Sequence, residues 1–79
     1  MISKPTFTCS FDNEDAAKSF LRITTSTNFS SNPRYPFLEG FVHGQNVYVT
    51  GTGSITFDMI LKTKLEEKAK EYGGKLNHN

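Results

Sequence analysis

Residues 37–53, FLEGFVHGQNVYVTGTG, decide the fold, because they predict two β-strands folded on each other about Gly44. A two-residue loop with glycine in first place suits a type II′ turn, since glycine takes a positive φ without steric cost. A turn centred one residue later would pair Gly44 with Val47 and set unlike side chains on one face. The favoured register has six pairs: His43 with Asn46, Val42 with Val47, Phe41 with Tyr48, Gly40 with Val49, Glu39 with Thr50 and Leu38 with Gly51.

This register separates the hairpin into an aliphatic face and an aromatic face, because side chains alternate across a strand. The aliphatic face, which we expect to lie beneath helices, carries Leu38, Gly40, Val42, Val47 and Val49. The other face mixes rings with polar groups and carries Phe37, Glu39, Phe41, His43, Asn46, Tyr48 and Thr50. We expect this second face to look outward, toward solvent or a partner.

The residues before the hairpin predict a strand, a helix and a long loop. Alternation over Lys4–Phe11 is typical of a half-buried strand, with Phe7, Cys9 and Phe11 inward. Asp12 is the expected N-cap of a helix that ends near Ile23 and has acidic residues in its first turn. Residues 24–36, TTSTNFSSNPRYP, predict an irregular loop rich in Ser, Thr, Asn and Pro. A short strand within 23–27 is the alternative there.

The residues after the hairpin predict a second helix over about 55–72 and a polar tail over 75–79. Ser54 or Thr56 would cap the helix, and Gly73 would end it in a left-handed conformation. The tail has room for one short edge strand. The expected inward stripe of the helix is Phe57, Leu61, Leu65, Ala69 and Tyr72, with Met59 and Ile60 broadening it near the start.

These elements predict one small α+β domain over residues 1–79, because a chain of 79 residues leaves no room for a second core. The order is β-α-β-β-α, and we expect a two-layer sandwich with an antiparallel sheet and both helices on one face. With a short final strand the order would match the ferredoxin-like arrangement, a match of topology that many unrelated functions share.

Composition narrows the classes of function. Nine basic and eight acidic residues give a net charge of +1, so no strong field steers the chain toward polyanions. The single cysteine, Cys9, excludes an intrachain disulfide and every cysteine-rich zinc site. The chain has neither a signal-peptide pattern nor an apolar run of membrane-spanning length. We therefore expect a cytoplasmic protein, in a cell or an infected host, without a membrane partner.

Catalytic motifs are weak, and we expect neither an enzyme nor a cofactor or metal. Residues 51–54, Gly-Thr-Gly-Ser, could present backbone N–H groups to an anion at a helix start, but they lack the third glycine or the lysine of phosphate-binding motifs. A tight turn explains them equally well. Cys9 could pair with His43 or His78 as a nucleophile, although the expected burial of Cys9 opposes this.

The aromatic face is the candidate binding surface. Its mixture of rings and polar groups is typical of protein interfaces, and docking could use the face itself, the outer strand edge or a homodimer. We expect a small regulator or inhibitor that occupies a larger protein partner, and a phage or mobile-element origin is compatible with this. The alternatives are stacking of single-stranded RNA on the rings, and burial of the rings by the 24–36 loop. The expected contact residues are Arg34, Phe37, Glu39, Phe41, His43 and Tyr48.

Overall fold

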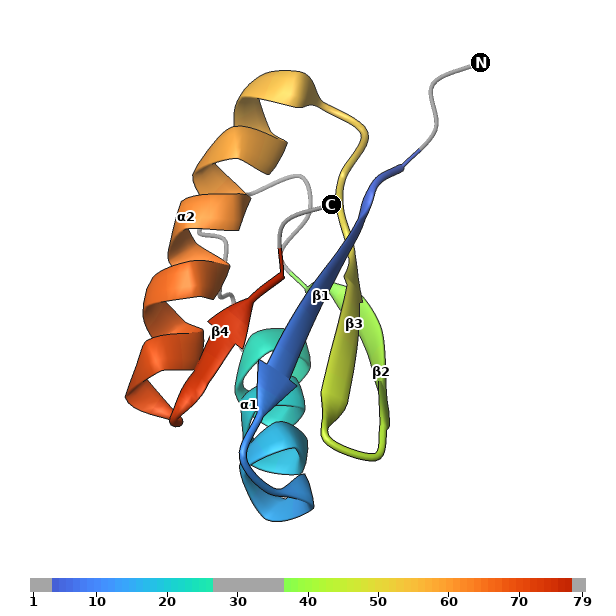
Figure 1. Ribbon diagram of the computed structural model, residues 1–79. Coiled ribbons are helices and arrows are strands. Elements are labelled where there is room, and N and C mark those ends of the chain that lie inside the picture. Colours follow the sequence, from blue (N-terminus) through green and yellow to red (C-terminus); the bar gives the residue numbers. More distant parts are fainter. Residues whose placement is uncertain (1–3, 27–36, 78–79) are drawn as a thin grey trace.

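The computed structural model describes residues 4–26 and 37–77, which form four strands and two helices in the order β-α-β-β-α-β (Figure 1). Arg34 and most of the predicted 24–36 loop lie outside the described residues. The elements are β1 (Thr6–Phe11), α1 (Glu14–Ser26), β2 (Glu39–His43), β3 (Asn46–Thr50), α2 (Ile55–Glu71) and β4 (Gly74–Leu76). The fold is therefore α+β, and the short final strand that the sequence allowed is present.

The four strands form one antiparallel sheet in the order β2-β3-β1-β4 (Figure 1). The hairpin register is confirmed for five pairs, from His43 with Asn46 to Glu39 with Thr50. Gly44 has the positive φ, 61°, that the predicted turn requires. β1 and β2, which flank α1 in the chain, are separated in the sheet by β3. Likewise, β3 and β4, which flank α2, are separated by β1, and this is the ferredoxin-like arrangement.

Both helices pack against one face of the sheet through a shared hydrophobic core. Cys9 and Phe11 of β1 and the two β3 valines, Val47 and Val49, are buried together with side chains from both helices. The helical members are Ala17, Phe20, Leu61, Leu65 and Ala69. Gly40 of β2 permits a close approach of α1, because a Cβ there would lie 3.2 Å from Leu21 Cδ1. The same Cβ would also lie 2.6 Å from the carbonyl oxygen of Tyr48 on β3. The aliphatic face of the hairpin thus lies beneath helices, as predicted.

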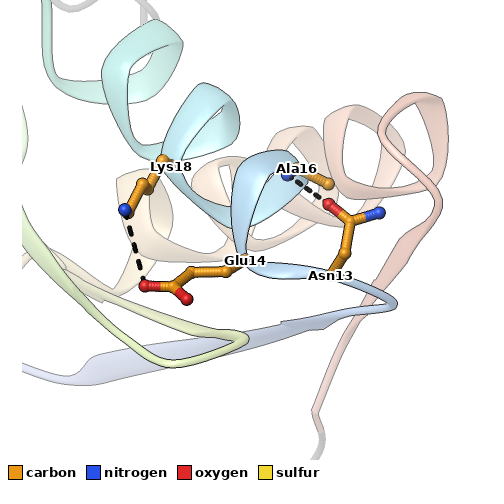
Figure 2. A network of polar contacts seen from close by, with 4 residues as sticks. All are labelled: Asn13, Glu14, Ala16 and Lys18. Carbon is orange, nitrogen blue, oxygen red and sulfur yellow. Dashed lines mark hydrogen bonds and ion pairs between the residues drawn. The ribbon is translucent and has the colours of Figure 1, made fainter.

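Helix α1 begins one residue later than its predicted cap implied. Asn13, not Asp12, is the N-cap: its Oδ1 accepts a hydrogen bond of 2.8 Å from the backbone N–H of Ala16 (Figure 2). Glu14 lies in the first turn, as expected for an acidic residue at the positive end of the helix dipole, and pairs with Lys18 at 3.4 Å (Figure 2). Both side chains of that ion pair are exposed, so the pair adds little stability.

Helix α1 also continues to Ser26 instead of ending near Ile23, and the alternative of a strand there is wrong. The hydroxyl of Thr24 donates to the carbonyl oxygens of Phe20 and Leu21, and that of Thr25 donates to Leu21 at 2.7 Å. These bonds to the preceding turn satisfy the hydroxyls inside the helix, and Thr24 is fully buried. Local preference of threonine for irregular structure is thus overridden by packing.

Helix α2 buries Leu61, Leu65 and Ala69 of the predicted stripe, with Tyr72 packed against the core, and differs from the prediction in its first turn. Its buried residues are Asp58, Leu61, Leu65 and Ala69, whereas Phe57, Met59 and Ile60 are exposed. Ser54 occupies the N-cap position without a side-chain hydrogen bond, and Tyr72 is the C-cap before Gly73, whose φ is 76°. The prediction of an inward Phe57 was wrong because a carboxylate takes the inward position in the first turn.

Candidate functional site

The face of the sheet opposite the core, here called the open face, carries the hairpin aromatics. By strand alternation it is formed by side chains of all four strands: Thr6, Thr8, Ser10, Glu39, Phe41, His43, Asn46, Tyr48, Thr50 and Lys75. Each of these side chains is partly or fully exposed, whereas Val47 and Val49 on the other face are fully buried. The predicted orientation of the hairpin is therefore confirmed.

An aromatic pair forms the centre of the candidate site. Phe41 and Tyr48 are cross-strand neighbours whose ring centroids lie 4.9 Å apart with an interplanar angle of 21°. Phe41 is 60% exposed, and Phe37, in the bend before β2, is 62% exposed. The Phe41 and Tyr48 rings are held by paired backbone on both strands, so a partner that contacts them need not first order a flexible segment.

Polar side chains flank the aromatic pair at both ends. Glu39 and His43 are exposed on β2, on either side of Phe41. Beside Glu39 and Phe37 lies a hollow of about 90 Å³ that Lys4 and Thr50 also line. The structure thus brings together five of the six predicted contact residues, and Arg34 lies outside the described residues.

The open face also carries a row of hydrogen-bonded polar side chains that the sequence did not predict. The Ser10 hydroxyl donates to Asn46 Oδ1 at 2.8 Å, and the Asn77 amide donates to Ser10 Oγ at 2.8 Å. These residues come from β1, β3 and the segment after β4. The row connects strands far apart in sequence, so only knowledge of the strand order could have revealed it.

A carboxylate of the same chain, that of Asp58, accepts hydrogen bonds from the Gly51–Ser54 segment. Asp58 Oδ1 accepts hydrogen bonds from the backbone N–H and the hydroxyl of Thr52 at 2.8 and 2.9 Å, and Asp58 Oδ2 accepts from the N–H of Gly53 at 3.0 Å. Asp58 is buried and comes from the first turn of α2. Two of the N–H groups that could cradle an external anion are therefore already paired, which favours the interpretation as a tight turn.

A second exposed apolar surface was also missed. Ile55 and Met59, on the first turns of α2, are 80% and 67% exposed. With Pro5 and Phe7 they line an open groove of about 390 Å³ between α2 and the start of β1. The sequence assigned Met59 to the core because its spacing fits a helical stripe. The inward position of Asp58 turns it toward solvent.

Cys9 and His43, which the sequence could pair as nucleophile and base, lie on opposite faces of the sheet. Cys9 lies on the core face and is fully buried, whereas His43 is exposed on the open face, so the sheet separates them. Within residues 4–26 and 37–77, no cluster of three or more His, Cys, Asp or Glu side chains is placed to hold a metal ion. His78 lies outside the described residues.

Cys9 is expected to be inert in the folded protein. Burial raises the pKa of its thiol from 9.0 to about 12, because the thiolate would lose its hydration. At pH 8 a thiol reagent such as iodoacetamide should modify Cys9 only after unfolding in urea. Equal rates of modification in the native and unfolded protein would contradict this.

The same shift makes stability depend on pH. The folded state keeps a proton that the unfolded state releases above pH 9, so stability falls as pH rises from about 9 to about 12. In urea titrations, the stability difference between wild type and Cys9→Ala should therefore shrink over this range. Parallel pH profiles for the two proteins would contradict the expectation.

The fold and the open face together define a small α+β domain with an exposed aromatic sheet surface. In the part of the chain that the structure describes, neither helix has the length and apolarity to cross a bilayer. Comparison with family models, curated proteins and solved structures finds no match to this chain.

Proposed function

We propose that this protein is a non-enzymatic regulator or inhibitor that binds a larger protein and occupies part of its surface. The observation that supports the proposal best is the stacked pair of Phe41 and Tyr48 on the open face, with Phe41 60% exposed. Aromatic side chains are enriched where partner contacts contribute most of the binding energy. Their position on paired strands gives a rigid surface that loses little conformational entropy on binding.

The surroundings of the pair suit a protein partner. Glu39 and His43 provide a polar rim, and the Ser10–Asn46 hydrogen bond holds polar groups on the neighbouring strands. Apolar centres with polar rims are typical of protein interfaces. The contact set is Phe37, Glu39, Phe41, His43 and Tyr48, and the proposal extends to Arg34 from the sequence alone.

Binding of single-stranded RNA is the second candidate, because stacked rings on a four-stranded sheet can also accept bases. Against it, β1, one of the two inner strands, presents Thr6, Thr8 and Ser10 to the open face and no ring. Glu39 adds a negative charge beside the aromatic pair, and the net charge of the chain is only +1. RNA binding would show affinity that falls steeply as salt rises, since bound phosphates release counterions.

The double variant Phe41→Ala with Tyr48→Ala should lose capture of the protein partner while the fold survives. Truncating two central aromatic contacts should weaken binding by at least about a hundredfold. The measurement is affinity capture from an extract of the expressing cells, quantified by mass spectrometry with and without nuclease. Circular dichroism of the variant checks the fold.

The matched control is Ile55→Ala with Met59→Ala, which removes two exposed apolar side chains from the α2 groove. It should leave capture unchanged. The proposal is wrong if this control loses the partner and the Phe41/Tyr48 variant retains it. Capture that disappears after nuclease treatment would instead support the RNA alternative.

A further inference from the structure

The outer edge of β2 has backbone groups that no described residue pairs with. β2 is an edge strand of the sheet. The hydrogen bonds of the other strands show which of its backbone groups point toward β3 and which point outward. The N–H of Gly51 donates to the Pro5 carbonyl and the N–H of Asn77 donates to the Thr8 carbonyl, which shows which residues of β1 face β3 and which face β4. The same alternation, followed through the β1–β3 and β3–β2 pairs, places the backbone N–H and C=O groups of Gly40 and Val42 on the outer edge of β2.

The two edges of the sheet differ in how they are protected. β4 has three residues and carries Lys75, and short, lysine-bearing edges resist pairing. β2 has five residues, EGFVH, with no lysine or proline and with Phe41 exposed. A strand of this kind is able to pair with another strand.

The sequence of β2 is complementary to itself. When two copies pair antiparallel about a twofold axis at Phe41, Phe41 meets its own copy, and Glu39 lies opposite His43 of the second copy. The outward-facing Gly40 and Val42 then pair with each other through backbone hydrogen bonds. Cross-strand positions of this type bring side chains within contact distance.

Neighbouring registers lose this complementarity. An axis at Gly40 sets Glu39 opposite Phe41, and an axis at Val42 sets Phe41 opposite His43. The axis at Phe41 alone gives one ring pair and two carboxylate–imidazole pairs. An imidazole N–H can donate to a carboxylate whether or not the ring is protonated. Within the described chain, Glu39 has no ion pair that would compete.

We infer that the chain forms a homodimer through antiparallel pairing of the two β2 edges about Phe41, with Glu39 of each copy against His43 of the other. The occupant of the edge is a second copy, because the complementarity of an imidazole donor with a carboxylate acceptor and the twofold register are both built into one five-residue strand. The dimer joins two open faces into one continuous sheet surface. This goes beyond the proposed function and does not depend on it, since the seam is a strand edge and forms without another protein.

The test is a charge swap measured by sedimentation equilibrium of the purified chain from about 10 µM to 1 mM. The wild-type mass should rise from 8.9 kDa toward twice that value. His43→Glu sets two carboxylates against each other and removes the donor, so it should raise the dimer dissociation constant about tenfold. Glu39→Lys removes the acceptor and should also raise the dimer dissociation constant.

The double variant Glu39→Lys with His43→Glu places a lysine opposite a carboxylate, which restores a donor–acceptor pair, and should return the dissociation constant to within about threefold of wild type. Lys75→Glu, on the β4 edge, is the control and should leave it unchanged. A wild type that remains monomeric at about 1 mM overturns the inference. A double variant whose dissociation constant is no lower than those of the single variants also overturns it. An association that is weakened only by Lys75→Glu overturns it as well.

Discussion

Replacing Phe20 with alanine is expected to lower the free energy of unfolding by about 4 kcal/mol. Phe20 is fully buried in α1, with its ring centroid 4.9 Å from that of Phe11 and 6.2 Å from that of Tyr72. It therefore joins α1 to β1 and to the end of α2. Its removal leaves a cavity at the contact of three elements, and the close-packed surroundings can only partly collapse into it.

The loss is large relative to the stability expected of a 79-residue domain, about 4–12 kcal/mol. Urea unfolding followed by circular dichroism measures it. If Phe20→Ala is unfolded without urea, Phe20→Leu provides a milder measurable change of about 1–2 kcal/mol. The control is Phe57→Ala, the same truncation at a ring that is 42% exposed. Equal losses at the two positions would refute the assignment of Phe20 to the centre of the core.

Replacing Asp58 with alanine is expected to cost about 3 kcal/mol, because several buried donors would lose their acceptor at once. The carboxylate accepts from two backbone N–H groups and from the Thr52 hydroxyl. It thereby ties the end of β3 to the first turn of α2. Asp58→Asn keeps one acceptor oxygen and should lose about half as much.

The same urea titration compares these variants with Glu67→Ala, which truncates an exposed carboxylate on the same helix. That control should change stability by less than about 0.5 kcal/mol. If Asp58→Ala is as stable as the control, the Asp58 hydrogen bonds do not hold the turn. A stable Asp58→Ala protein that binds phosphate would show that the Gly51–Ser54 segment can accept an external anion once its internal one is removed.

The hairpin was predictable because its determinants are local. The two-residue turn at Gly44 sets the register, and alternation then assigns every side chain to one face without knowledge of the rest of the fold. The placement of Phe41 and Tyr48 on the open face follows directly. Arg34 stays a prediction, because it lies outside the described residues.

The first turn of α2 was not predictable from hydrophobic spacing. Periodicity assigned Phe57 to the core, but the N–H groups at the end of β3 require an acceptor, and Asp58 provides it. The need to satisfy buried polar groups thus determined which side chain of the first turn of α2 lies inward. Met59 moved to the surface as a consequence, and the apolar groove beside β1 formed.

By itself the amino-acid sequence determined the β-α-β-β-α order, the hairpin register and the division of the hairpin into a buried aliphatic face and an exposed aromatic one. These depend on contacts between residues close in the chain. Only the tertiary structure decided the strand order, the polar row from Ser10 to Asn77 and the inward position of Asp58. The strand order and the polar row depend on groups from distant segments that satisfy one another's hydrogen bonds. The inward position of Asp58 depends on the turn that presents the N–H groups of Thr52 and Gly53 to it, which hydrophobic spacing does not specify.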